Sequence, residues 1–121
     1  MLILVAHGSR DPHWRGSLHA LCDNVTAQLP GEEVKVAFMQ FDGPSLPEVV
    51  AEGVRAGEKS FRLLPLFMAS AGHVDKDIKP LVAELALKHP GVKLDLMTPV
   101  GEDPLFPSLI IKITNGPPSA E

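Results

Sequence analysis

Four short apolar runs, separated by stretches of helical periodicity, constrain the fold of this chain more than any other feature. Each run is rich in Val, Ile, Leu and Phe and has the length of one buried strand; the runs are Leu2–Ala6, 34–39, 61–67 and 92–97. Between them apolar residues return at steps of three or four, as in Trp14, Leu18, Leu21, Val25 and Leu29. This alternation predicts an α/β doubly wound single domain, with a four-stranded parallel sheet, right-handed crossovers and helices on both faces.

Capping patterns mark where the predicted helices begin and end. Asp11-Pro12, Ser45 with Glu48, and Asp103-Pro104 are typical of helix starts. Proline or glycine ends the first three helices, in segments 29–31 and 89–91 and at Gly57. Two prolines, Pro80 and Pro107, fit their predicted helices poorly because a proline inside a helix removes a hydrogen bond. We expect one domain at 1–114, followed by a flexible tail at 115–121.

Composition excludes several classes of protein. With 121 residues the chain suits one hydrophobic core, and its net charge of −4 without a basic block offers no surface for nucleic acid. No apolar run approaches the roughly 20 residues that span a bilayer, and Leu2–Ala6 is too short for a signal peptide, so we expect a cytoplasmic protein. The single cysteine, Cys22, cannot form an internal disulfide and is interpreted as a small core residue.

Two histidines follow predicted strands. Ligands of open α/β sheets bind beyond the carboxyl ends of the strands. There His7 follows the first strand, in HGSRD, and His73 follows the third, in MASAGH. Neutral imidazole can bind a late first-row divalent metal or take a proton near neutral pH, so the pair suggests a metal or acid–base site. By position alone, ordinary hydrogen-bonded loop histidines are the slightly favoured interpretation.

Two segments together resemble a known family. HGSRDP after the first strand and AGHVDKDI after the third are similar to the signature segments of the small sirohydrochlorin chelatases, the CbiX group of the class II chelatases. VAFMQFDGPSL, PLFMASAGHV and HPGVKLDL fit the layout of that family, and the resemblance extends over residues 1 to 110. It implies a lyase that inserts a divalent metal into sirohydrochlorin, in which His7 and His73 bind the metal and take protons from pyrrole nitrogens.

The resemblance also suggests how the substrate binds. The small residues Ser70, Ala71 and Gly72 would let the backbone approach a flat ring, although a tight turn also favours small residues. Arg10 and Lys76 could pair with the carboxylates of sirohydrochlorin, or they could be ordinary solvated charges.

One position departs from the family pattern. Many members have a glutamate where this chain has Gln40. Glutamine cannot relay protons, but its neutral amide oxygen is a candidate, weaker metal ligand. Asp42, two residues later and on the same face if the strand continues, is a candidate third metal ligand.

Several functional points stay open at this stage. Cobalt is the favoured metal, with iron and nickel as alternatives, and we expect no organic cofactor. A single domain of this size builds a deep tetrapyrrole cleft with difficulty, so we expect a symmetric homodimer. The alternative function is a non-catalytic carrier of metal or tetrapyrrole. A phosphate binder is disfavoured, because the loop after the first strand has few Gly, Ser or Thr residues.

Overall fold

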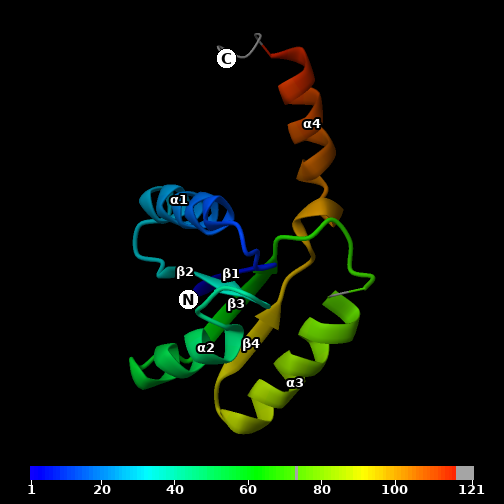
Figure 1. Cartoon of the computed structure of the whole chain (residues 1–121). Coiled ribbons are helices and arrows are strands. Elements are labelled where there is room, and N and C mark those ends of the chain that lie inside the picture. Colours follow the sequence, from blue (N-terminus) through cyan, green and yellow to red (C-terminus); the bar gives the residue numbers. More distant parts are fainter. Residues whose placement is uncertain (73, 117–121) are drawn as a thin grey trace.

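The computed structural model describes residues 1–72 and 74–116, and within them the chain forms a parallel sheet flanked by helices (Figure 1). The strands are β1 (Leu2–Ala6), β2 (Val34–Phe38), β3 (Ser60–Pro65) and β4 (Lys93–Leu96). The α-helices are α1 (Pro12–Gln28), α2 (Leu46–Arg55), α3 (Lys79–Lys88) and α4 (Leu105–Asn115). A π-helix, η1 (Val74–Ile78), precedes α3, and a 3-10 helix, η2 (Val100–Glu102), precedes α4. The four strands lie in the order β2-β1-β3-β4 and all pair in parallel, which confirms the predicted α/β fold.

The alternation of side chains along β1 divides the buried apolar residues between the two faces of the sheet. Ile3 and Val5 belong to the core beneath α2 and α3, whereas Leu2, Leu4 and Ala6 belong to the core beneath α1. Every residue of β1 is buried, as expected for a central strand of a parallel sheet.

The structure confirms that Cys22 is a small core residue. Its thiol lies on the buried side of α1 and donates a hydrogen bond to the carbonyl of Val34 at 3.4 Å. Burial raises the pKa of the Cys22 thiol, so the reactive thiolate is disfavoured.

Two of the three predicted helix-start patterns provide the N-cap of their helix. At α4 the N-cap is Pro104 instead of Asp103, whose side chain accepts a hydrogen bond from the Leu105 N–H at 2.8 Å. Asp11 is the N-cap of α1, where its side chain accepts a hydrogen bond from the backbone N–H of His13 at 2.9 Å. Ser45 and Glu48 form both bonds of a capping box at α2. Glycines with positive φ follow the first three helices, at Gly31, Gly57 and Gly91.

The two badly fitting prolines have different explanations. Pro80 is the second residue of α3 and is preceded by the wider π-helical turn of η1. A wider turn relieves the clash between a proline ring and the carbonyl four residues earlier. Pro107 lies in the first turn of α4, where its missing N–H would have no partner within the helix.

The strand and domain ends differ slightly from the sequence prediction. β2 ends at Phe38 and β3 at Pro65, one and two residues earlier than predicted. The predicted tail, 115–121, begins with the last residue of α4, and 117–121 lie outside the described residues. In the described parts of the chain, no helix combines the length and the apolar character needed to cross a bilayer.

Candidate functional site

Close packing between neighbouring loops shapes the carboxyl edge of the sheet. A Cβ atom added at Gly8, in the loop after β1, would lie 1.3 Å from the carbonyl oxygen of Gln40, in the loop after β2. A Cβ atom added at Gly101, in η2, would lie 2.3 Å from the carbonyl oxygen of Met68, after β3. Glycine is thus required at both contacts, because any side chain would force the loops apart.

A cavity of about 320 Å³ opens at this edge, lined by His7, Met39, Gln40 and Asp77. It joins residues from the loops after β1 and β2 to one from η1. A larger hollow of about 450 Å³ lies beside α1 and β2, around residues that include Cys22, away from the carboxyl edge. We select the smaller cavity as the candidate site, because it holds one of the two predicted histidines at the edge where ligands of this fold bind.

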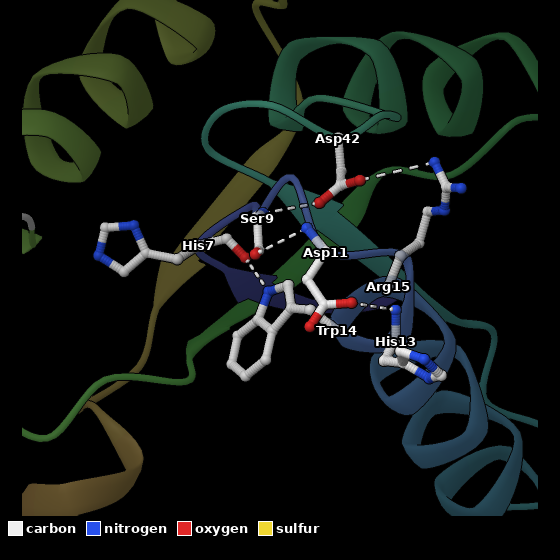
Figure 2. Close-up of polar contacts among 7 residues, drawn as sticks. All are labelled: His7, Ser9, Asp11, His13, Trp14, Arg15 and Asp42. Carbon is white, nitrogen blue, oxygen red and sulfur yellow. Dashed lines mark hydrogen bonds and ion pairs between the residues drawn. The ribbon is translucent and has the colours of Figure 1, made fainter.

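His7 is held by contacts on both its backbone and its ring. The indole N–H of Trp14, in the first turn of α1, donates a hydrogen bond to the His7 carbonyl at 2.6 Å. The His7 ring meets the Phe67 ring edge-on, with centroids 4.8 Å apart. Figure 2 shows the imidazole pointing away from α1, on the opposite side of the loop from Asp42 and Arg15. Trp14 of α1 therefore holds the backbone at His7, and Phe67, in the loop after β3, packs against its ring.

Asp42 lies elsewhere than the sequence analysis expects. The chain leaves the strand at Phe38 and turns, with Phe41 at φ 67°, so Asp42 does not continue the strand on the face of Gln40. Its carboxylate accepts a hydrogen bond from the Ser9 N–H at 2.8 Å and lies 3.5 Å from the guanidinium of Arg15 (Figure 2). The Asp42 side chain is 5% exposed and does not line the cavity. Gln40 therefore lines the cavity, whereas Asp42 links the loop after β2 to the loop after β1.

The predicted substrate-binding cations are exposed near this edge. The guanidinium of Arg10 stacks on the Phe41 ring, 4.9 Å from its centroid. Lys76 lies in η1 and is exposed. Lys79, one turn later, pairs with Asp75 at 2.7 Å. Arg10 is thus held over the loop after β2, where a carboxylated ligand could reach it.

The small-residue loop after β3 is fastened to η2. Ser70 donates two hydrogen bonds to the Glu102 carboxylate, one from its backbone N–H at 2.7 Å and one from its hydroxyl. The following residues, Ala71 and Gly72, are exposed, and Gly72 has φ 77°. His73 lies outside the described residues, so its predicted position is untested. The carbonyls of Ser70 and Gly72 accept hydrogen bonds from the backbone N–H groups of Asp75 and Lys76, so the loop is also fastened to the start of η1.

Asp77 is a cavity residue that the sequence analysis missed. It lies four residues after His73 in the second signature segment, and a carboxylate so close in sequence to a predicted metal-binding histidine could have drawn attention to it. Among the described residues no group of three or more His, Cys, Asp or Glu side chains is placed to hold a metal. The described lining therefore offers one imidazole, one carboxylate and one amide, a donor set that can bind a divalent cation or move a proton.

Comparisons with known proteins agree with this architecture. The CbiX family model matches residues 1–114. The chain is 31% identical over 81 residues to the sirohydrochlorin cobaltochelatase of Methanococcus maripaludis, covering 67% of this chain and 56% of that protein. It is 28% identical over 119 residues to the sirohydrochlorin cobaltochelatase of Methanosarcina acetivorans, with 92% and 91% covered. For several curated relatives the match thus spans little more than half of their length.

Solved structures share the fold. The crystal structure of a putative cobalamin biosynthesis CbiX protein from Marinobacter aquaeolei has a TM-score of 0.82 and 32% identity, over 94% of this chain and 90% of that one. The sirohydrochlorin chelatase SirB from Bacillus subtilis, in complex with cobalt, has a TM-score of 0.79 and 20% identity. The match covers 94% of this chain but only 49% of SirB. This domain therefore corresponds in fold to about half of the larger protein.

Proposed function

Because the chain belongs to the CbiX family, we propose that it is a metal chelatase that inserts a divalent cation into sirohydrochlorin. Cobalt is the favoured metal, since several archaeal relatives are named cobaltochelatases; a Bacillus subtilis relative is named a ferrochelatase, which keeps iron as an alternative beside nickel. The metal and the tetrapyrrole are substrates, and the proposal includes no organic cofactor. It also includes the cytoplasmic location expected from the sequence.

The observation that carries the proposal is the placement of His7 at the cavity on the carboxyl edge, with Asp77 and Gln40. Insertion replaces two pyrrole N–H protons by a metal, so the site must present the cation and accept protons near the ring. A neutral imidazole can do either at neutral pH. His7 and His73 share these two roles in the proposal, with His73 assigned from its place in the second signature segment.

The carboxylate of the site is assigned to Asp77. Gln40 lines the cavity but has no charge, and Asp42 is occupied by Ser9 and Arg15. Asp77 is the one carboxylate among the described lining residues. A carboxylate beside an imidazole favours cation binding and stabilises an imidazolium. Asp77 is thereby proposed to compensate for the neutral side chain at Gln40.

Binding of the ring is assigned to the rim of the site. The small side chains of Ser70, Ala71 and Gly72 are proposed to let a flat macrocycle come close to this loop, and Arg10 and Lys76 are proposed to pair with its carboxylates.

A cavity of about 320 Å³ is at the small end of ligand pockets, which typically enclose most of the ligand surface. A symmetric homodimer is therefore part of the proposal, with a second copy completing the enclosure.

The test is anaerobic absorbance-monitored insertion of cobalt, ferrous iron and nickel into sirohydrochlorin, with enzyme far below substrate. His7→Ala and His73→Ala should each slow insertion by about 100-fold or more, because a positioned acid–base group contributes roughly 10² to 10⁴ in rate. Asp77→Asn should slow it less, because the histidines remain. His19→Ala is the matched control, since His19 is exposed in α1 and does not line the cavity, and it should insert metal at the wild-type rate.

The alternative function is a non-catalytic carrier of metal or tetrapyrrole, and the neutral Gln40 at the cavity favours it. A carrier would bind cobalt or sirohydrochlorin in proportion to protein and give no multiple turnover. If none of the three metals is inserted faster than in the uncatalysed reaction, the chelatase proposal fails and the carrier replaces it.

A further inference from the structure

An exposed acid lies at the edge of the sheet where the proposed function brings a carboxylated ring. Glu102 is the last residue of η2, which follows the carboxyl end of β4. It is not among the described residues that line the cavity. Sirohydrochlorin carries several carboxylates, and like charges repel, so an acid at this edge weakens binding of the ring unless it has another task. The contacts of Glu102 indicate that task.

The Glu102 carboxylate binds one residue of the loop after β3. Its Oε1 accepts hydrogen bonds from the Ser70 N–H at 2.7 Å and from the Ser70 hydroxyl. Its Oε2 lies 3.1 Å from the same hydroxyl. Hydrogen bonds to an ionised acceptor are about twice as strong as those between neutral groups. The two residues are 32 positions apart, so this Ser70–Glu102 contact joins two loops that only the sheet brings together.

The segments on either side of the small-residue loop are fixed by other contacts. Before the loop, the Phe67 carbonyl accepts a hydrogen bond from the Gly101 N–H at 3.0 Å, and Gly101 packs on the backbone of Met68. After the loop, Val74 and Ile78 of η1 are buried in the core beneath α2 and α3. Loss of the Ser70–Glu102 contact therefore loosens the small-residue loop and leaves both flanks in place.

We propose that Glu102 is a positioning residue for binding of the tetrapyrrole, because through Ser70 it fixes the loop against which the ring lies. The inference rests on the proposed function and deepens it by naming what holds the ring-binding loop. The N–H and the hydroxyl of Ser70 are both engaged by Glu102, so Ser70 acts through the position of its loop. Metal binding at His7 and Asp77 does not depend on this contact, so the binding of ring and metal should respond differently to its loss.

The first test is the dissociation constant of sirohydrochlorin, measured by anaerobic absorbance titration without metal. Glu102→Ala should weaken binding about tenfold, the scale of one lost charge-assisted hydrogen bond. Electrostatics alone predicts the opposite sign, because removal of a negative charge near a polyanion strengthens binding. Glu84→Ala is the matched control, since Glu84 is an exposed glutamate of α3, and it should not weaken binding. Equal or tighter binding by Glu102→Ala overturns the proposal.

Two further variants separate the hydrogen bonds from the charge. Glu102→Gln should restore most of the affinity, since its amide oxygen can still accept from Ser70. Ser70→Ala keeps a small side chain and the backbone N–H but loses the hydroxyl, so its affinity should lie between the wild type and Glu102→Ala. Added to Glu102→Ala it should cause no further loss, because both residues act in one contact. A glutamine variant as weak as the alanine variant, or losses that add, overturns the proposal.

The second test is the insertion assay, in which Glu102→Ala should raise the KM for sirohydrochlorin by the same factor. The KM for cobalt and kcat should stay at their wild-type values, and a fall in kcat alone overturns the proposal. If the protein binds sirohydrochlorin but inserts no metal, the chelatase proposal fails and the titrations still decide the role of Glu102. If the wild type binds no sirohydrochlorin, the ring-binding role of Glu102 is overturned.

The contact itself is tested in the protein alone by amide hydrogen exchange followed by nuclear magnetic resonance. The Ser70 amide should exchange faster in Glu102→Ala than in the wild type, because it loses its acceptor. The Met97 amide, which donates to the Leu63 carbonyl in the sheet, is the internal control and should exchange at an unchanged rate. Equal exchange of the Ser70 amide in both proteins shows that the contact does not hold the loop, and overturns the proposal.

Discussion

Replacing Gly8 by alanine should be among the most damaging small changes in this protein. The added Cβ would lie 1.3 Å from the Gln40 carbonyl oxygen, 2.5 Å from its carbon and 3.0 Å from the Asp42 nitrogen. Carbon atoms in contact stay about 3.5–4.0 Å apart, so the loops after β1 and β2 must separate by roughly 2 Å. All three obstructing atoms belong to the backbone and cannot rotate aside. Overpacking typically lowers the free energy of unfolding by 1–3 kcal/mol. Because the obstructing backbone atoms cannot move aside, we expect a loss of about 3 kcal/mol.

The assay is urea unfolding followed by circular dichroism. For a small protein a loss of about 3 kcal/mol lowers the unfolding midpoint by roughly 1–3 M, given slopes near 1–3 kcal/mol/M. Gly16→Ala is the matched control, because Gly16 lies within α1 and an added Cβ there meets nothing within 4 Å. It should raise the unfolding free energy by about 0.5–1 kcal/mol, the usual gain for alanine in a helix. Equal midpoints for Gly8→Ala and the wild type would refute the packing argument.

Three further predictions concern the frame around the site. Asp42→Ala should lower the unfolding free energy by about 1.5–3 kcal/mol in urea titrations, because the Ser9 N–H loses a charged acceptor; an unchanged midpoint would show that this tie is not needed. Ser45→Ala should lower the free energy of unfolding by about 1 kcal/mol, because α2 loses its N-cap side chain. The N–H and the hydroxyl of Ser45 hold the pKa of Glu48 below its ordinary value. Ionised Glu48 therefore stabilises the fold at pH values above its ordinary pKa, and this stabilisation is lost as the pH falls through the lowered pKa. Thermal melts from pH 7 to pH 3 should therefore show a smaller loss in Ser45→Ala than in the wild type. Ile3→Val should cost about 1 kcal/mol by differential scanning calorimetry, since Ile3 is fully buried, and a cost near zero would contradict the close packing of that core.

The strand order along the chain and the helix ends were predictable because both depend on local chemistry. Apolar runs of strand length, Asp11 before proline, and Ser45 with Glu48 act within a few residues of themselves, so their effects are visible in one dimension. The position of His7 at the carboxyl end of β1 was predicted by the same reasoning, since it directly follows the first strand.

Asp42 and Asp77 show where sequence reasoning fails. The expected role of Asp42 assumed that β2 continues beyond Phe38, but the turn at Phe41 directs the carboxylate to Ser9 and Arg15. Asp77 reaches the cavity because η1 brings it towards the loops after β1 and β2. Neither outcome follows from neighbouring residues, since both depend on contacts across more than thirty positions of the chain.

The sequence by itself determined the alternation of strands and helices, the helix caps, the burial of Cys22 and the placement of His7 at a strand end, because each depends on residue type and local spacing. Only the tertiary structure decided which loops touch and which carboxylate lines the cavity. Those features arise from parallel strands that pair across long stretches of chain, and the loops at their ends meet only after the sheet has formed.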